Sequence, residues 1–254
     1  MGKARALAAI GVLLASVALV GAALANHSWA NYHWEGASNP RNLTVGDNLS
    51  GGWGAYLTTA IADWNQSTVI ELNKVSGQAG SNCSAVSGRM EVCNGAYGTT
   101  GWLGIAQIWV AKGGHITQAT TKVNDTYFSQ AQYNTSAWRQ LVMCQEIAHD
   151  FGLDHQDENF NNPNLGTCMD YTNDPSTNQH PNAHDYEQLL VIYGHLDGSG
   201  GGGKPCNPHK PGCQTGAGTA PPFSQASRAR GDVYLDALPN GGHRITHVFW
   251  APLG

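Results

Sequence analysis

The sequence predicts an α+β protein, and three observations carry this prediction. The chain has 254 residues, of which 41% are hydrophobic and 12% charged, so it is long enough to bury a sizeable core. Several short segments rich in β-branched residues or alternating in polarity are typical of strands. Three other segments carry apolar residues at helical spacing. With 13 basic against 18 acidic residues and no long basic run, a nucleic-acid partner is not expected.

The first half of the chain is expected to be mainly strands, with one helix. The strands are expected at 68–75, 103–110 and 115–123, and an extended segment at 32–45. The helix is expected over 50–66, because apolar side chains recur on one face from Tyr56 to Trp64. Residues 76–100 are rich in Gly, Ser and Asn and are expected to form a long loop.

The second half is expected to contain two helices and a hairpin. A helix is expected over 137–151, with Ser136 as its N-cap and Gly152 directly after its end. A long polar loop over 154–181 leads to a last helix over 184–195. Two alternating strands around a Pro-Asn-Gly-Gly turn predict a β-hairpin over 230–250.

The N-terminal segment has the pattern of a secretory signal peptide. Lys3 and Arg5 precede an uncharged run that ends in the small-residue site Ala23-Leu24-Ala25. A membrane anchor is the alternative, and the small residues favour cleavage. The expected organisation is a signal peptide at 1–25, a main domain at 26–196, a Gly/Pro-rich linker at 197–222 and a β-hairpin appendage at 223–254. We therefore expect a secreted, extracellular monomer that does not stay in the membrane.

Six cysteines are an even number in a chain expected to be secreted, so disulfides are expected. Six cysteines allow 15 pairings, and sequence alone does not choose among them. Their spacing suggests three local pairs, which are Cys83–Cys93, Cys144–Cys168 and Cys206–Cys213.

One stretch carries the chemistry, and it runs from Gln145 to His155 as Q-E-I-A-H-D-F-G-L-D-H. On a helix, residues 145 and 149 lie one turn apart on the same side. Gly152 can adopt positive φ, end the helix and turn the chain, so that His155 returns toward His149. Two imidazoles and one further ligand suit a catalytic zinc ion, and Glu146 beside them can act as general base.

The stretch resembles the motif of the metzincin zinc peptidases, H-E-x-x-H-x-x-G-x-x-H followed by a Met-turn. Glu146, His149, Gly152 and His155 match it, and Met169 in Cys-Met-Asp-Tyr looks like the Met-turn methionine. The chain is most similar to secreted bacterial matrixin-like proteins, over about residues 30–196. The resemblance implies a metzincin-like, or zincin, domain with a twisted mixed sheet, an active-site helix, a Met-turn and a C-terminal helix. It also implies that a strand such as 103–110 forms the upper edge of the cleft.

The resemblance implies a zinc endopeptidase that acts on extracellular proteins or peptides. Zn²⁺ would be held by Gln145, His149 and His155, Glu146 would take a proton from the attacking water, and Tyr171 is a second catalytic candidate. Gln145 departs from the family, because its neutral amide is a poorer match to zinc than imidazole. Two alternatives therefore stay open: a catalytically inactive domain that binds protein or glycan, and a disulfide-stapled structural protein.

Calcium is a further candidate cofactor. An Asn-rich loop carries oxygen ligands of the kind that Ca²⁺ prefers, which are Asp157, Glu158, Asp170 and Asp174. The spacing is not that of an EF-hand, and a solvated loop explains the composition as well. His115 is interpreted as a surface histidine at a strand end. For His180, His184 and His195, metal binding and scattered surface positions are both open.

Overall fold

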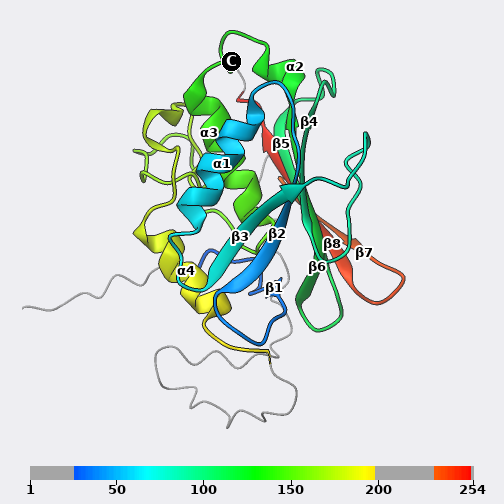
Figure 1. Ribbon diagram of the computed structural model, residues 1–254. Coiled ribbons are helices and arrows are strands. Elements are labelled where there is room, and N and C mark those ends of the chain that lie inside the picture. Colours follow the sequence, from blue (N-terminus) through cyan, green and yellow to red (C-terminus); the bar gives the residue numbers. More distant parts are fainter. Residues whose placement is uncertain (1–25, 198–231, 253–254) are drawn as a thin grey trace, which may run out of the picture.

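The computed structural model describes residues 26–197 and 232–252, and its central feature is a mixed sheet with helices packed on one face (Figure 1). The strands are β1 (His33–Trp34), β2 (Arg41–Asn48), β3 (Ile70–Ser76), β4 (Met90–Gly95), β5 (Trp102–Val110), β6 (His115–Asn124), β7 (Val233–Ala237) and β8 (His243–Trp250). The helices are α1 (Trp53–Trp64), α2 (Asp125–Phe128), α3 (Ser136–His149), the 3₁₀ helix η1 (Pro175–Thr177) and α4 (Ala183–Tyr193). The α+β class with a twisted mixed sheet is confirmed.

The strands follow the order β3-β2-β4-β6-β5-β8-β7, with β1 paired to β6 away from this path. Pairing is parallel from β3 through β2 and β4 to β6, and antiparallel from β6 through β5 and β8 to β7. The antiparallel half contains hairpins, whereas the parallel half needs crossover connections such as α1 between β2 and β3.

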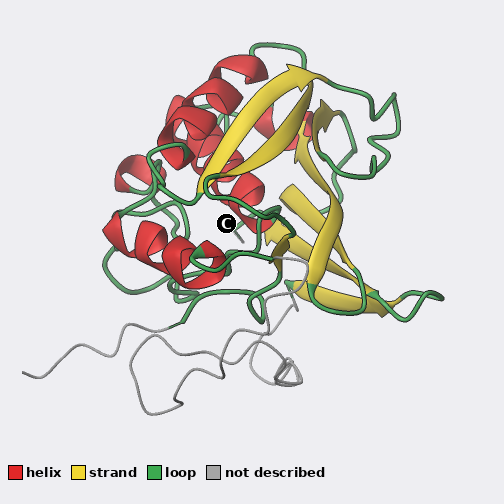
Figure 2. Cartoon of the chain, turned by 60° about the horizontal axis from the view of Figure 1, so that its bottom comes forward, coloured by secondary structure: helices red, strands yellow, loops and turns green. Residues whose placement is uncertain are grey.

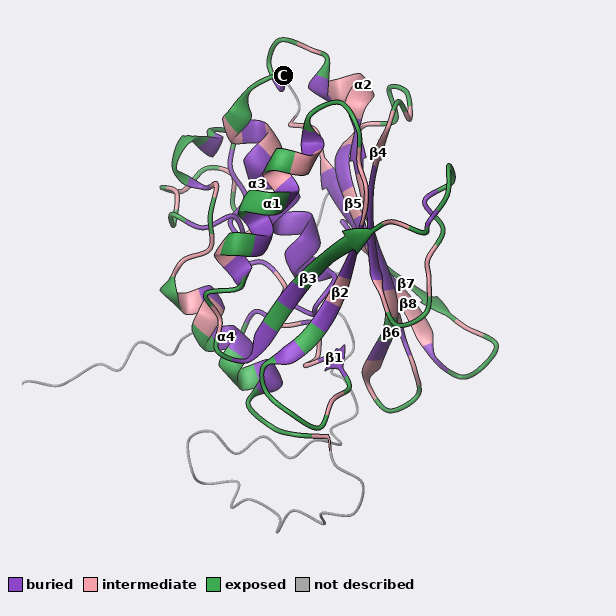
Figure 3. Ribbon diagram, viewed as in Figure 1, coloured by how far each residue is buried: buried purple, intermediate pink, exposed green. Residues whose placement is uncertain are grey.

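Helices α1 and α3 lie side by side against the sheet, and Figure 2 shows both layers from below. The buried side of α1 presents Trp53, Leu57 and Trp64 to the core, as its apolar spacing predicted. Figure 3 shows that the facing surfaces of the sheet and of α3 are buried, while the outer side of α1 is exposed. The core therefore fills the space between these two layers, and α3 lies at its centre.

The C-terminal hairpin was predicted as an appendage, and the structure places it inside the main sheet. β8 pairs along β5 from Trp102 to Val110, and β7 then becomes the edge strand. The hairpin itself, with its turn at Gly241, forms where the alternating pattern predicted it. Because β5 has β6 on one side and β8 on the other, it is not an edge strand of the sheet.

The segment 76–100, predicted as a loop, contains strand β4 between β2 and β6. Its surroundings are loop-like, and Cys83–Cys93 ties the preceding turn to β4. The strand was missed because Gly, Ser and Asn dominate the window, whereas its burial comes from neighbours distant in sequence. The segment 32–45 also separates into β1 and β2 around a turn.

Two predicted regions lie outside the described residues, which are the signal peptide at 1–25 and all but the first residue of the linker at 197–222. The Cys206–Cys213 pair lies there too. Within 26–197 and 232–252, no helix is long and apolar enough to cross a membrane.

Candidate metal centre

Helix α3 carries four polar side chains into the interior of the molecule, and three of them belong to the motif. The Thr135 side chain caps its N-terminus by accepting a hydrogen bond from the Trp138 N–H at 3.2 Å. All residues from 140 to 149 are buried, including Gln145, Glu146 and His149. Burying such groups costs free energy unless each finds a partner, so their partners define the site.

The chain turns sharply after α3 at Gly152, which has a φ of 93°. A Cβ at this position would collide with the Tyr32 carbonyl oxygen, so both the conformation and the space require glycine. The turn returns His155 to the end of the helix, where the Nε2 atoms of His149 and His155 lie 3.1 Å apart. This juxtaposition was predicted from the motif.

The third imidazole comes from strand β8 and was not predicted. The His247 ring centroid lies 4.1 Å from that of His149 and 4.7 Å from that of His155. One ring nitrogen from each of the three histidines lies within 4.8 Å of the others, and all three residues are buried. The motif places a histidine ligand at position 145 on α3. Here the third imidazole comes from the C-terminal hairpin instead.

Polar contacts of the Nδ1 atoms orient the three rings, by hydrogen bonds for His149 and His247 and by nearby carboxylates for His155. His149 Nδ1 donates to the Leu153 carbonyl at 2.8 Å, and His155 Nδ1 lies 3.5 Å from carboxylate oxygens of both Asp154 and Glu158. His247 Nδ1 lies 3.2 Å from Glu146 Oε2. A ring that donates through Nδ1 offers the Nε2 lone pair to a cation, which is how acceptors around metal sites orient histidine ligands. The three residues therefore fit a zinc ion.

Glu146 lies directly beside these rings. Burial raises the pKa of its carboxyl, and His247 acts in the opposite direction. Gly104 on β5 makes this place available, since a Cβ there would meet Glu146 Cγ at 2.7 Å. Glu146 Oε1 is buried and has no hydrogen-bond partner among the described residues, whereas Oε2 is held by His247.

The Gln145 amide points to the segment that carries the methionine. Its Nε2 donates to the Cys168 carbonyl at 2.8 Å, and its Oε1 is buried without a hydrogen-bond partner among the described residues. The structure therefore uses the nitrogen end of this side chain to join α3 to the Met169 segment. A role for Gln145 Oε1 as a ligand stays a prediction.

The Met169 segment lies beside the site, where the Tyr171 ring centroid is 4.3 Å from that of His155. The disulfide Cys144–Cys168, predicted from spacing, ties it to α3, and Met169 is fully buried. The Tyr171 hydroxyl donates to Asp232 Oδ2 at 2.5 Å and lies 3.3 Å from His247 Nε2. Tyr171 is therefore at the cluster, as predicted, but its hydroxyl already has partners from the C-terminal segment.

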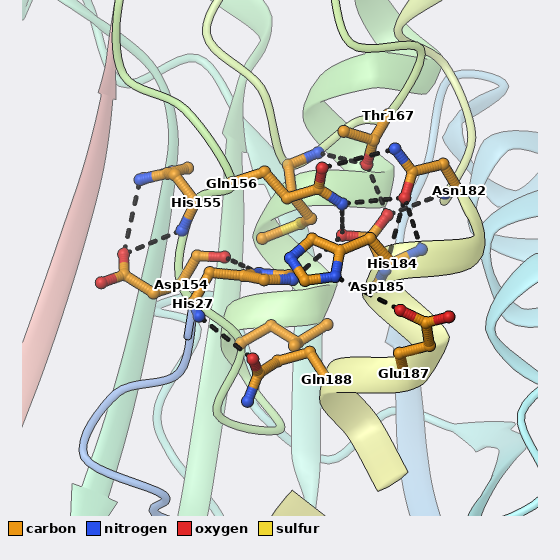
Figure 4. A network of polar contacts seen from close by, with 12 residues as sticks. His27, Asp154, His155, Gln156, Thr167, Asn182, His184, Asp185, Glu187 and Gln188 are labelled. Carbon is orange, nitrogen blue, oxygen red and sulfur yellow. Dashed lines mark hydrogen bonds and ion pairs between the residues drawn. The ribbon is translucent and has the colours of Figure 1, made fainter. Parts of the chain in front are cut away.

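A polar network holds the loop that carries His155 (Figure 4). Gln156 Nε2 donates to Asp185 Oδ1 and Asn182 Oδ1, each at 2.8 Å, and its backbone N–H donates to the Met169 carbonyl at 2.7 Å. His27 Nδ1 donates to the Asp154 carbonyl at 2.9 Å. The start of α4, the Met169 segment and the N-terminal residues thus position His155 together.

The four acidic residues proposed for calcium do not gather into one cluster among the described residues. Asp157 and Asp174 accept hydrogen bonds from backbone N–H groups two residues further on. Asp170 accepts from Leu165 and Asn178, and Glu158 faces His155. Their oxygens serve the loop itself, so the calcium prediction has no support.

Three residues at the site were not predicted from the sequence, which are His247, Asp232 and Trp29. The Trp29 ring stacks on that of His149, with ring centroids 4.8 Å apart and an angle of 5° between the ring planes. Trp29 precedes the first strand, and His247 is one of several histidines in an alternating segment. Neither has a fixed spacing to the motif. Only the strand pairing of β8 with β5 brings His247 to α3, with Ala106 opposite it.

No protein-family model and no curated protein sequence matches the chain. Solved structures that resemble it include high choriolytic enzyme 1, a hatching-enzyme zinc protease from the medaka fish Oryzias latipes, and myroilysin. The first is 12% identical with a TM-score of 0.36, over 65% of this chain and 96% of the enzyme; the second is 14% identical with a TM-score of 0.39, over 66% and 98%. Likeness at these scores establishes no activity, which therefore has to be argued from the site.

Proposed function

We propose that the chain is a zinc-dependent endopeptidase whose site is covered by its own C-terminal hairpin. The observation that carries the proposal is the grouping of His149, His155 and His247 around one point, with Glu146 beside them. Three neutral imidazoles are a donor set typical of catalytic zinc, which keeps one position open. Zinc bound there would supply a Lewis acid that polarises a peptide carbonyl and makes water more acidic.

Glu146 would move the proton in this reaction. Its Oε1 atom has no hydrogen-bond partner among the described residues, so it can accept a proton from the attacking water and pass it to the leaving amine. Burial raises the pKa of this carboxyl, which is the direction that brings a general base nearer to a neutral working pH. In the closed structure, His247 holds the other oxygen.

The site is closed in this structure, because Glu146, His149 and His247 are 0% exposed. β8 occupies the side of β5 on which a peptide could add as an extra strand. Peptide access therefore requires β8 to separate from β5, which also withdraws His247 from the cluster. In that open form Gln145 Oε1 is a candidate to complete the donor set on α3, in keeping with the motif.

The experiment is a peptidase assay on the zinc-loaded chain from residue 26 onward, with casein as substrate. We expect Glu146→Gln to lower activity by about 100-fold or more, the usual contribution of a general base, while zinc content stays unchanged. Glu71→Gln, an exposed glutamate on β3, is the matched control and should retain full activity. Equal activity in both variants would show that Glu146 is not the base.

A catalytically inactive, zinc-stabilised binding domain is the second candidate. The complete burial of the cluster beneath β8 favours it, because a purely structural zinc site is closed. This function predicts zinc in the natural chain without peptidase activity at any concentration of a casein or peptide-library substrate. Activity that a chelator removes and zinc restores would exclude it.

A further inference from the structure

A second histidine cluster lies at the end of β6 opposite to α2. His33 on β1 and His115 at the start of β6 are directly paired across the two strands. His195 and Asp197 follow the end of α4. We infer that these four residues, here called the His33 cluster, form a binding site for a zinc-like divalent transition-metal cation. None of them belongs to the centre on α3.

The distances between the donor atoms fit one cation. His33 Nε2 lies 3.1 Å from His195 Nε2 and 3.3 Å from Asp197 Oδ1. Asp197 Oδ1 also lies 3.4 Å from His195 Nε2 and 3.7 Å from His115 Nε2. Ligands at the usual zinc bond lengths in a tetrahedron are roughly 3.3 Å apart. His33, His115 and Asp197 each place one donor atom within 4.8 Å of the others, and His195 adds a further donor beside His33 and Asp197.

Hydrogen bonds hold two further polar atoms of the cluster, His33 Nδ1 and Asp197 Oδ2, and orient these two ligands. His33 Nδ1 donates to the Asn31 carbonyl at 2.8 Å, which leaves Nε2 as the lone-pair nitrogen facing the cluster. Asp197 Oδ2 accepts from the Gly36 N–H at 3.0 Å and from Arg41 Nη2 at 3.2 Å. Oδ1 is therefore the oxygen turned toward the histidines.

The chemistry of the donors selects the class of cation. Three imidazoles and one carboxylate suit Zn²⁺ and its neighbours Co²⁺ and Ni²⁺, whereas Ca²⁺ and Mg²⁺ prefer all-oxygen sites. The side chains of His33 and Asp197 are 11% and 12% exposed, and those of His115 and His195 are 34% and 49% exposed. The site is thus anchored on buried ligands and open to solvent on one side, which gives a cation a route of entry.

A cation here would join the start of the folded chain to the end of α4. Without it, that junction depends on the Asp197–Arg41 ion pair and on reciprocal backbone and side-chain bonds between Gly36 and Asp197. With it, β1, β6 and the segment after α4 share one bound ion. The expected role is stabilisation of the fold, independent of the reaction proposed for the α3 centre.

The test is the number of Co²⁺ and Zn²⁺ ions bound by the chain from residue 26 onward, purified without a histidine tag and stripped with a chelator. We expect two ions for the natural chain, and one each for His115→Ala and His195→Ala, which keep the α3 centre. His180→Ala changes a histidine that is 55% exposed and paired with Asp63, and should still bind two. His247→Ala should lose the other ion, which separates failure of this site from failure of the α3 centre.

Circular dichroism of the variants shows whether each one folds, and His115 and His195 are exposed enough for replacement to leave the core intact. The second equivalent of Zn²⁺ should raise the Tm of the natural chain and leave the Tm of folded His115→Ala unchanged. The proposal is overturned if the natural chain and the two folded variants bind the same number of ions. It is equally overturned if His180→Ala loses an ion as they do.

Discussion

At the scale of single residues, the sequence motif identified two of the three histidines at the α3 centre and the glutamate beside them. His149, His155 and Glu146 are brought together as the spacing predicted, because a helix followed by a glycine turn is a local structure. His247 could not be predicted, since its place depends on strand pairing between distant segments. The proximity of His33 and His115 could not be predicted for the same reason, because it depends on the pairing of β1 with β6.

Gly152 has a structural role that a substitution can measure. Gly241 is the matched control, because it also has positive φ, at 78°, but a Cβ there would meet nothing within 4 Å. We expect Gly241→Ala to lower the free energy of unfolding by about 1–2 kcal/mol, the usual strain of this conformation. Gly152→Ala should cost at least about 1 kcal/mol more, because the Tyr32 carbonyl must also move. Equal losses in urea unfolding would show that the contact with Tyr32 relaxes freely.

At the scale of elements, the helices and hairpin were predicted more completely than the sheet. α1, α3 and α4 follow from apolar spacing and caps within each segment, although Thr135 rather than Ser136 is the N-cap of α3. β4 lies in a Gly- and Ser-rich stretch and is specified by its neighbours β2 and β6. Local pattern therefore located α3, which carries the candidate metal centre, whereas the strand order required the three-dimensional structure.

The two described disulfides should differ in their effect on metal binding. Cys144–Cys168 connects α3 to the segment that carries Met169, while Cys83–Cys93 closes a turn before β4. Replacing either pair by alanines should lower the free energy of unfolding by about 2–4 kcal/mol. Only the Cys144→Ala/Cys168→Ala variant should also weaken zinc binding, by about 10-fold or more, as loss of support around metal ligands does.

Chelator competition on both folded double variants gives the two affinities. Equal zinc affinities would mean that the Cys144–Cys168 bridge supports the fold without positioning the metal ligands.

At the scale of the whole molecule, the C-terminal hairpin completes both the sheet and the candidate metal centre. It adds β8 to β5, supplies His247, and brings Asp232 to the Tyr171 hydroxyl. The end of the described chain thus closes over a site built from its middle. If the chain is the peptidase proposed above, it acts only when β8 moves away from β5.

This movement can be blocked by a covalent link across the two strands. Gln107 and Thr246 are directly opposite each other on β5 and β8, and their side chains form a hydrogen bond of 2.9 Å. In a Gln107→Cys/Thr246→Cys variant, the two cysteines can form a disulfide, which mass spectrometry verifies. This variant should have at least about 10-fold lower peptidase activity than the natural chain, because each 1.4 kcal/mol added to the free energy of strand opening lowers the rate by a factor of ten. Each single cysteine variant is a control and should stay active. Full activity in the linked chain would show that substrate enters without strand separation.

The most direct test of the account is the zinc affinity of the closed chain with either His247 or Gln145 replaced. It is measured by chelator competition in a His115→Ala background, which removes the His33 cluster as a second site. His247→Ala should weaken zinc binding by about 100-fold or more, because it removes a metal ligand, and Gln145→Ala should change it far less. If Gln145→Ala releases the zinc while His247→Ala retains it, the metal is held by the helix motif alone and the centre described above is wrong.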